Sequence, residues 1–450
     1  MKIKYDLIVI GGGSGGVRAA RIAAQNGAKV ALCEKSRMGG TCVIRGCIPK
    51  KLLFYAAQQK DFFKAAEDYG WESRNHKNNF PKLIKNKNNE LNRLEKLYEK
   101  TLIKNRVKIY KGSAKFIDSE TIKVSNNYLQ AKKIIIAVGG KTKMLNIEGK
   151  EHCIGSDEIM DLQSIPKKLT ILGGGYIAIE FAFIFASLGS KVSLISRSKI
   201  LRKFDKHLVT LVEKKLKEKN VELYSKQNIT KIQLKNKKKQ VFLKNKKKIE
   251  ADEVLIAIGR TPNIDKLNLE YIGIKINSQK AIKVDKNLKT NIKNIYAIGD
   301  VTDRINLTPV AIAEGQALSL KLFGNKNNKI NLEYVGSAVF SQPPICSIGL
   351  SEEEAKKKYK KLKIYESTFT SLKYSIVKIK TPTYIKLIVN ESNKRVIAGH
   401  MFGEEAPELI QMIGVAIDAK ATIDNFINTM AIHPTTAEEF VTFSNYARKI

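Results

Sequence analysis

Two cysteines, Cys42 and Cys47, lie close together in the stretch GGTCVIRGCIPKK, with four residues between them. On a regular helix, residues at this spacing are about 7.5 Å apart along the axis, whereas a disulfide needs Cα atoms about 5 to 6 Å apart. A bond between these thiols therefore requires a distorted helical turn, which Gly46 can permit because glycine has wide backbone freedom. So small a ring removes little entropy from the unfolded chain. We therefore interpret the pair as a disulfide that opens and closes in a redox reaction.

Upstream of the cysteines, the segment YDLIVIGGGSGGVRAARIAAQNGAKVALCEKS has the pattern of a strand, a glycine-rich turn, an amphipathic helix and a second strand. Gly11, Gly13 and Gly16 fit the pattern GxGxxG, in which glycines let the backbone turn tightly and approach a pyrophosphate at a helix N-terminus. Glu34 ends the second strand and is placed to accept hydrogen bonds from a ribose diol. The segment therefore predicts a dinucleotide site.

The same pattern returns in KKLTILGGGYIAIEFAFIFASLGSKVSLISRS, where Gly173 and Gly175 repeat the first two glycines and Ala178 takes the third place. Two dinucleotide sites imply two cofactors. The most economical pair is a tightly held flavin dinucleotide in the first site and a diffusible nicotinamide in the second. Hydride would pass from nicotinamide to flavin, and the two cysteines would receive the electrons.

The second copy lacks the acidic residue of the first. Counted from the first glycine of each copy, the position of Glu34 is taken by Ser196. A carboxylate there would repel the 2′-phosphate of NADP, whereas Ser196, Arg197 and Arg202 would attract it. We therefore predict NADP rather than NAD at this site. The alternative is that the two arginines are ordinary surface cations of a basic protein.

Length and composition are those of a soluble protein with two or three domains. The chain has 450 residues, of which 43% are hydrophobic, and no apolar run approaches the roughly 18 residues of a membrane helix. The N-terminal MKIKYDLIVIGGG enters a strand pattern at once and leaves no room for a signal peptide, so we expect a cytoplasmic protein without a membrane partner. Five cysteines are too few for a secreted disulfide framework, and no metal-binding spacing is present.

The net charge of +37 raises the alternative of a nucleic-acid-binding protein on this scaffold, because runs such as KNKKKQVFLKNKKK resemble phosphate-binding patches. The VFL between two lysine-rich stretches instead fits a solvated hairpin. The excess of lysine is also spread along the whole chain. We therefore expect no nucleic-acid partner, and we expect the charge to attract anionic small molecules.

Six motifs follow one another along the chain: GGTCVIRGCIPKK, GGGYIAIE, AIGRTPN at 257–263, IYAIGD at 295–300, LTPVAIAEG at 307–315 and HPTTAEE at 433–439. The set resembles the flavin-dependent pyridine nucleotide-disulfide oxidoreductases of class I, and most closely their glutathione reductase branch. The resemblance implies an α/β fold with two Rossmann-like dinucleotide-binding domains and a C-terminal α+β dimerisation domain. It places the FAD-binding domain at 1–141 and 264–333, the NADPH-binding domain at 142–263 and the dimerisation domain at 334–450.

The resemblance also implies roles for single residues. Cys47 would be the thiol next to the flavin, and Cys42 the interchange thiol that attacks the substrate disulfide. Lys50 would pair with Glu180 near the flavin ring, and Tyr176 would cover the nicotinamide pocket. The residues implied to contact FAD or NADPH are Gly11, Gly13, Ser14, Gly15, Gly16, Glu34, Gly40, Thr41, Cys42, Lys50, Ala114, Gly139, Asp300, Thr308, Gly173, Gly175, Tyr176, Ile177, Glu180, Arg197, Arg202, Gly259 and Arg260.

His433 is the acid–base candidate, because an imidazole titrates near neutral pH and can exchange a proton with Cys42 and with a leaving thiolate. The resemblance selects Glu438, rather than Glu439, as the carboxylate that orients it. In the family this histidine reaches the thiols from the partner subunit. We therefore expect a homodimer in which His433 completes the partner's active site.

The substrate implied by the resemblance is glutathione disulfide. Its carboxylates suit Arg21, with Ser14 beside it and Arg18 on the same helix. Tyr98 matches a tyrosine that packs against bound glutathione. Gln316 departs from an arginine found in some glutathione reductases, so NADPH-dependent reduction of another low-molecular-weight disulfide stays an alternative.

Other branches of the family fit the sequence less well. Dihydrolipoamide dehydrogenases use NAD, which Ser196 argues against, and the C-terminus TFSNYARKI lacks the redox-active tail of mercuric reductases and large thioredoxin reductases. The remaining cysteines, Cys33, Cys153 and Cys346, have no evident partner in the sequence and are expected to be buried small residues.

Overall fold

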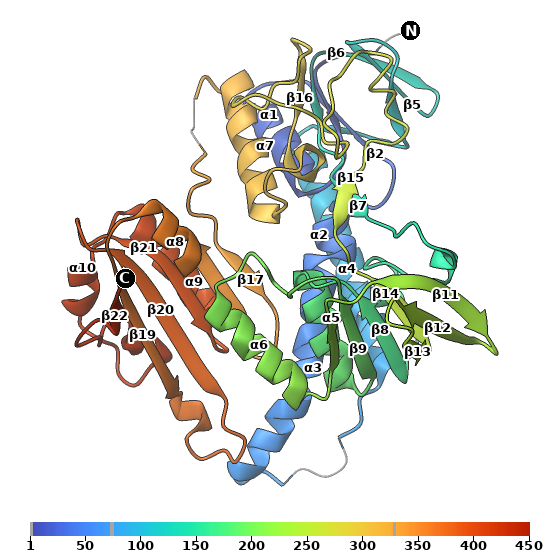
Figure 1. The fold of residues 1–450 in the computed structure, drawn as a ribbon. Coiled ribbons are helices and arrows are strands. Elements are labelled where there is room, and N and C mark those ends of the chain that lie inside the picture. The colour runs from blue at the N-terminus through green and yellow to red at the C-terminus, as the bar shows by residue number, and fades with distance from the viewer. Residues whose placement is uncertain (1–2, 73–75, 327–329) are drawn as a thin grey trace.

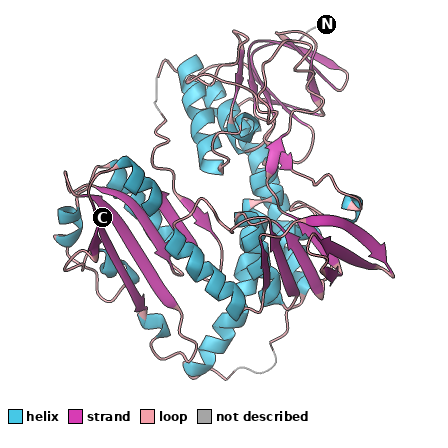
Figure 2. Cartoon of the chain, viewed as in Figure 1, coloured by secondary structure: helices cyan, strands magenta, loops and turns pink. Residues whose placement is uncertain are grey.

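The chain folds into three lobes, with the long helices α3 (Cys47–Asp68) and α4 (Phe80–Lys104) running between them (Figure 1). The computed structural model describes residues 3–72, 76–326 and 330–450. Each lobe is built on its own sheet, and helices cover the sheets (Figure 2). We name the lobes first, second and third in the order in which the chain enters their sheets. Among the described residues, no helix is long and apolar enough to span a membrane.

The first lobe contains a seven-stranded sheet in the order β3-β2-β1-β6-β5-β4, with β16 beside β6. Its strands are β1 (Ile3–Ile10), β2 (Val30–Glu34), β3 (Lys108–Lys111), β4 (Ala114–Phe116), β5 (Thr121–Val124), β6 (Asn127–Ile136) and β16 (Ile295–Ala297). The pairs β1–β2, β1–β6, β2–β3 and β6–β16 are parallel, as expected when helices connect the strands. Helices α1 (Ser14–Gln25) and α7 (Thr308–Phe323) pack against each other, and the hydroxyl of Ser319 donates to the carbonyl of Ala19 at 2.9 Å.

The second lobe contains a four-stranded parallel sheet in the order β10-β9-β8-β14. Its strands are β8 (Lys168–Leu172), β9 (Lys191–Ser196), β10 (Glu222–Ser225) and β14 (Glu253–Ile256), and its helices are α5 (Tyr176–Leu188) and α6 (Lys206–Glu218). Helix α5 is buried on nearly all sides because α3 packs against the side that faces away from the sheet. Helix α5 is therefore not amphipathic, unlike the corresponding helix α1 that follows the first glycine turn.

An antiparallel meander extends the second lobe. It consists of β11 (Ile229–Lys235), β12 (Lys238–Leu243) and β13 (Lys248–Ala251). The lysine-rich run predicted as a hairpin lies here, and Lys238 and Lys239 form ion pairs with Asp252 and Glu253. A two-stranded ribbon of β7 (Gly140–Thr142) and β15 (Arg260–Pro262) connects the first and second lobes.

The third lobe contains a six-stranded antiparallel sheet in the order β17-β18-β21-β20-β19-β22. Its strands are β17 (Ser337–Val339), β18 (Ile345–Gly349), β19 (Leu362–Thr370), β20 (Pro382–Asn390), β21 (Val396–Phe402) and β22 (Arg448–Lys449), and its helices are α8 (Glu352–Lys358), α9 (Ala406–Asp418) and α10 (Ile423–Ile427). One hydrophobic cluster joins this sheet to α3, α4 and α5 through Val339, Ile345, Tyr384 and Phe402. The second and third lobes therefore share a core.

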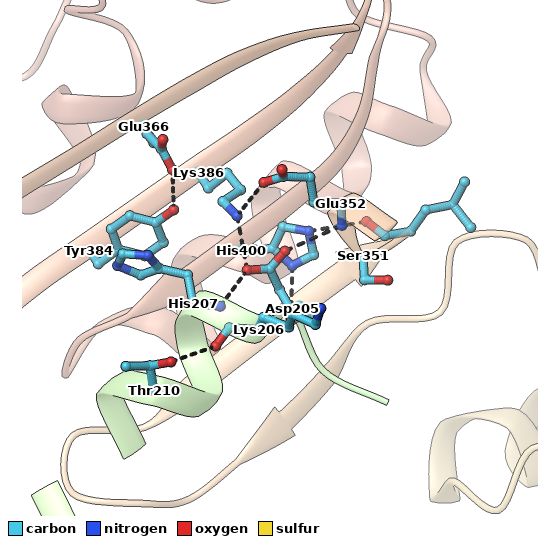
Figure 3. Close-up of polar contacts among 12 residues, drawn as sticks. Asp205, Lys206, His207, Thr210, Ser351, Glu352, Glu366, Tyr384, Lys386 and His400 are labelled. Carbon is cyan, nitrogen blue, oxygen red and sulfur yellow. Dashed lines mark hydrogen bonds and ion pairs between the residues drawn. The ribbon is translucent and has the colours of Figure 1, made fainter. Parts of the chain in front are cut away.

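A buried polar network also joins the second and third lobes (Figure 3). The Lys386 ammonium lies 2.9 Å from Asp205 Oδ1 and 3.1 Å from Glu352 Oε2, and the side chain of Lys386 is only 2% exposed. Beside it, both ring nitrogens of His400 are engaged, with Ser347 Oγ at 3.0 Å and the Leu350 carbonyl at 3.1 Å. Burial lowers the pKa of His400 to about 4. The neutral ring therefore donates from Nε2 to the carbonyl and accepts at Nδ1 from the hydroxyl.

We expect acid to destabilise the protein through His400. Because burial lowers its pKa from the ordinary 6.5 to about 4, the unfolded chain takes up a proton in this range that the folded chain does not. His400 therefore contributes stability above pH 6.5 that is lost as the pH falls towards 4, by up to about 1.4 kcal/mol per pH unit. Urea unfolding at several pH values measures the slope. The His400→Gln variant, which has no titrating ring, should have a shallower slope, and equal slopes would contradict the expectation.

Candidate active site

The helix that carries Cys42 is interrupted at Gly46. Helix α2 (Gly40–Arg45) ends before Gly46, whose backbone is non-helical (φ −152°, ψ −113°), and α3 begins at Cys47. A Cβ atom on Gly46 would lie 2.7 Å from the carbonyl oxygen of Thr41, so only glycine fits this break. The distortion predicted from the spacing of the cysteines is present. It brings the two thiols, both free in this structure, into hydrogen-bond contact.

The two thiols differ in acidity. The hydrogen bond from Cys42, a second from Thr308 and the charge of Lys50 lower the pKa of Cys47 to about 6, although burial opposes them. The contact with Cys47, together with burial, raises the pKa of Cys42. The Thr308 hydroxyl at the start of α7 lies 3.6 Å from Cys47 Sγ. The pair therefore holds its negative charge on Cys47 at neutral pH.

Lys50 and Glu180 form an ion pair beside the thiols. The Lys50 ammonium lies 2.7 Å from Glu180 Oε1, and the side chains are 11% and 3% exposed. The backbone N–H of Phe340 donates to the same carboxylate oxygen at 3.0 Å, and the Phe340 ring centroid lies 4.0 Å from the ammonium. Phe340 was not predicted from the sequence, because it follows β17 in the third lobe and belongs to no motif. The ammonium of Lys51 lies 3.7 Å from the same ring.

A cavity of about 870 Å³ surrounds this group of residues. It is lined by residues from all three lobes. The predicted site residues among them are Gly11, Gly13, Ser14, Gly15, Glu34, Gly40, Thr41, Cys42, Cys47, Lys50, Ala114, Gly139, Tyr176, Ile177, Glu180, Arg260, Asp300 and Thr308. Burial raises the pKa of Asp300, whereas Tyr176 lines the cavity with 43% of its surface exposed. Among the described residues, no cluster of His, Cys, Asp or Glu could hold a metal ion.

The first glycine turn fits a pyrophosphate. Gly11 has a φ of +109°, and a Cβ atom there would lie 2.4 Å from the carbonyl oxygen of Ala137. Gly16 does not line the cavity but lets α1 approach the turn, since its Cβ atom would meet Gly11 O at 1.9 Å. Helix α1 starts at the cavity with no side-chain cap on its free N–H groups, which suits a bound anion. Glu34 accepts from the N–H groups of Gly12 at 2.6 Å and Ser36 at 2.7 Å.

The second glycine turn has the same backbone solution. Gly173 has a φ of +146°, and a Cβ atom there would lie 2.2 Å from the carbonyl oxygen of Ala257. Helix α5 likewise starts without a side-chain cap, after Gly175. The residues of this site that do not line the cavity are Gly173, Gly175, Gly259, Arg197 and Arg202. The two glycine positions of this turn lie at the end of strand β8 of the parallel sheet, where the sequence predicts the second nucleotide.

The strand end of the second turn differs from that of the first. Ser196 is 2% exposed, and its hydroxyl donates to the carbonyl of Ser198 at 2.7 Å. Arg197 and Arg202 are exposed in the following loop. Within the described part of the chain, neither arginine has a carboxylate partner, so both are free to bind an anion.

Arg260 connects the two nucleotide regions. Its Nη2 donates to the carbonyl of Gly140 at 2.5 Å and to the Thr41 hydroxyl at 3.3 Å, and Asp157 lies 3.6 Å from Nη1. The Nε atom is buried and has no hydrogen-bond partner. Asp157, which also lies 3.8 Å from Arg45, was not predicted from the sequence.

A group of basic residues lies near Cys42. The Nη1 of Arg18 donates to Gln316 Oε1 at 3.0 Å, and the Nε of Arg21 is buried without a partner. Tyr98 lies within electrostatic reach of Cys42, Arg18 and Arg21, and burial raises its pKa. Ser14 contacts the Cys42 thiol. The structure thus brings together Ser14, Arg21 and Tyr98, the three residues predicted to bind the substrate.

His433 does not join this group within one chain. Its Nδ1 lies 2.9 Å from Glu438 Oε2, and its side chain is 80% exposed. Glu438 also closes the capping box at Thr435, so its position is fixed by the backbone. Neither residue lines the cavity. Within one chain, His433 and Glu438 therefore lie outside the cavity that holds the thiol pair.

Of the other three cysteines, Cys33 lines the cavity next to Glu34, whereas Cys153 and Cys346 do not line it. Cys33 and Cys346 are buried as expected, and burial raises the pKa of Cys33 to about 12. Cys153 is only partly buried, because it follows a short 3-10 turn (Lys150–His152) near the surface. The expectation of full burial is therefore wrong for Cys153.

Comparison with known protein families decides the relationship. The pyridine nucleotide-disulphide oxidoreductase family matches residues 5–315, and the dimerisation domain of the same family matches residues 335–443. The chain belongs to this family. The predicted fold class is confirmed, with two dinucleotide-binding lobes and a C-terminal dimerisation domain.

Individual members of the family are similar over the whole chain. Glutathione reductase of Burkholderia cepacia is 43% identical, and the alignment covers 99% of both chains. The chloroplastic/mitochondrial glutathione reductase of Pisum sativum is 40% identical over 99% of this chain and 83% of that protein. The structure of the HOCl-induced flavoprotein disulfide reductase RclA from Escherichia coli superposes with a TM-score of 0.88 at 27% identity and covers 98% of this chain and 99% of RclA. The resemblance to the glutathione reductase branch is confirmed.

In the reduced protein, we expect Cys47 to react with iodoacetamide with a midpoint near pH 6, because the thiolate is the reactive form. The Thr308→Val variant loses one hydrogen bond to that thiolate, so its midpoint should rise by up to about one pH unit. Alkylation rates at several pH values, with the modified cysteine located by mass spectrometry, measure this. The Cys47→Ser variant is the control for reaction at Cys42. A midpoint near 9 in the wild-type protein would contradict the assignment of the thiolate to Cys47.

Proposed function

We propose that the protein reduces glutathione disulfide to glutathione with NADPH, through FAD and the Cys42–Cys47 pair. The observation that carries the proposal is the pair of thiols, Cys42 and Cys47, in contact with each other. One of them is acidic, and the pair lies at a cavity near the two glycine turns. Full-length similarity to glutathione reductases supports the substrate and the cofactors. The activity makes the protein a flavoprotein disulfide oxidoreductase that maintains thiol redox balance.

The residues around the cavity suit FAD. The uncapped start of α1 would bind the pyrophosphate, Glu34 would bind the ribose, and Asp300 would contact the ribityl chain. At the second turn, Gly173 and Gly175 would approach the NADPH pyrophosphate, while Arg197 and Arg202 would bind its 2′-phosphate. When bound, FAD supplies the transfer of two electrons from NADPH to the Cys42–Cys47 disulfide.

The reduced thiols then act on the substrate. Cys42 loses its proton to a base, and its sulfur attacks one sulfur of glutathione disulfide, which forms a mixed disulfide and releases one glutathione thiolate. The Cys47 thiolate attacks Cys42, which restores the protein disulfide and releases the second glutathione. The low pKa of Cys47 keeps this second nucleophile ionised at neutral pH. Two electrons thereby reach the two glutathione thiolates. The base returns the Cys42 proton to the first thiolate, and the second thiolate takes a proton from solvent.

The acid–base group in this scheme is His433 of the partner subunit in a homodimer. Three observations support this assignment: the dimerisation domain, the exposure of His433, and its contact with Glu438. A carboxylate on Nδ1 leaves Nε2 to exchange the proton and stabilises the imidazolium. We also propose domain limits at 141, 263 and 333, and the cytoplasm as the compartment.

A second candidate substrate class has support from one contact. Gln316 offers a neutral amide to Arg18 where some relatives have an arginine, so this position adds no cation to those of α1. A low-molecular-weight disulfide with fewer carboxylates than glutathione disulfide would fit this charge arrangement. A panel of disulfides that differ in charge separates the two candidates.

The proposed function predicts rapid oxidation of NADPH by the purified holoenzyme with glutathione disulfide as the only electron acceptor. The Cys42→Ser variant should still pass electrons from NADPH to its flavin but should lose turnover by about 1,000-fold or more, because it lacks the attacking sulfur. Steady-state and single-turnover absorbance measurements test both statements. Cys153→Ser, which changes a partly buried thiol that does not line the cavity, is the control. Normal turnover in Cys42→Ser would contradict the proposed mechanism.

A heterodimer test addresses His433. One subunit would carry Cys42→Ser and the other His433→Ala, with different affinity tags for purification. If His433 acts on the partner's thiols, one site has both changes and the other has neither. The heterodimer should then show about half of wild-type activity, while both mutant homodimers are inactive. An inactive heterodimer would show that His433 serves its own subunit.

A further inference from the structure

The loop between β9 and α6 carries Arg197 and Arg202, and its first half is fixed within the second lobe. The Ser196 hydroxyl donates to the Ser198 carbonyl at 2.7 Å, and the N–H of Leu201 donates to the Gly174 carbonyl at 2.7 Å. Ile200 and Leu201 are 1% and 3% exposed. The glycine turn itself therefore holds this part of the loop.

The end of the loop is held from a different lobe (Figure 3). Asp205 is 2% exposed and accepts from the N–H of His207 at 3.1 Å, which caps α6. Its carboxylate also accepts from the N–H of Glu352 at 3.3 Å and from the Lys386 ammonium at 2.9 Å. Two of these three donors belong to α8 and β20 of the third lobe. Asp205 stands three positions after Arg202, so the third lobe fixes the backbone next to that arginine.

The charges around this contact hold it in place. Lys386 also donates to Glu352 at 3.1 Å, and Arg448 binds the two carboxylate oxygens of Glu352 at 2.7 and 2.6 Å. The hydrogen bonds from Arg448 lower the pKa of Glu352, so this carboxylate stays charged. Separating Asp205 from Lys386 would expose an unpaired charge to the protein interior, which is costly. The end of the loop therefore has one strongly preferred position.

We propose that Asp205, held by Lys386, is a positioning residue that sets Arg202 for the 2′-phosphate of NADPH, so that the dimerisation domain contributes to nicotinamide selectivity. The inference rests on the proposed use of NADPH. Charge-assisted hydrogen bonds to phosphate depend on close geometry, so a loop end that moves weakens them. NADH lacks the 2′-phosphate and does not use this contact. Loss of the tether should therefore affect the two cofactors unequally.

The test compares NADPH and NADH in steady-state kinetics of the holoenzyme with saturating glutathione disulfide. Asp205→Ala removes both the helix cap and the link to Lys386, and the KM for NADPH should rise about 3- to 10-fold. The KM for NADH and the kcat with either cofactor should change by less than about twofold. Asp205→Asn keeps the cap and an acceptor for Lys386, so it should lie closer to the wild type. Lys386→Gln breaks the link from the other side and should raise the KM for NADPH in the same way.

Glu366→Gln is the matched control, because Glu366 contacts Arg448 and Tyr384 in the same network but not Asp205. Its KM values for both cofactors should equal those of the wild type. The inference is wrong if the KM for NADPH and the KM for NADH change by the same factor in both Asp205→Ala and Lys386→Gln. The proposed function would still stand in that case. A wild-type enzyme that uses NADH as well as NADPH would overturn the proposed cofactor choice and, with it, this inference.

Discussion

The buried carboxylate of Glu180 joins three segments that are distant in sequence. It accepts from the Lys50 ammonium on α3 and from the backbone N–H of Phe340, while α5 carries it from the second lobe. A buried charge is tolerated only with partners in good geometry. The Lys50 ammonium and the N–H of Phe340 are therefore each held in a defined position. Lys50 lies one helical turn after Cys47, and the position of this carboxylate therefore also sets the thiol pair against the other lobes.

The two glycine turns show how one backbone solution serves two cofactors. Gly11 and Gly173 both have positive φ values and both approach a carbonyl oxygen too closely for a Cβ atom. The difference lies at the end of the second strand of each copy. There Glu34 presents a carboxylate held by two N–H groups, whereas the Ser196 hydroxyl turns back to its own loop. Under the proposed assignment of the two sites, phosphate binding is common to both, and the residues at the strand end set the choice of cofactor.

The features that the sequence predicts well are those set by neighbours along the chain. The break at Gly46, the glycine turns and the lysine-rich hairpin all follow from local spacing and local steric limits. Contacts between distant segments could not be predicted in this way. Nothing near Phe340 indicates that its N–H binds Glu180, and nothing near Lys386 indicates that its partner is Asp205, because such pairs depend on how complete lobes dock. The burial of α5 on all sides has the same origin, since it requires α3 as a second neighbour.

The second lobe is inserted between strands of the first lobe, and this order along the chain affects folding during synthesis. Strands β1 and β6 of the first sheet precede the second lobe in sequence, but β16, which covers the free edge of β6 next to the site, follows it. The strands of the second lobe are contiguous between residues 168 and 256, so its sheet can pair early, whereas the core that it shares with the third lobe closes later. The first sheet must wait for residues 295–297, and α7, which supplies Thr308 to the thiols, comes later still. During synthesis the sheet of the second lobe is therefore complete before the sheet of the first lobe, which lines much of the cavity.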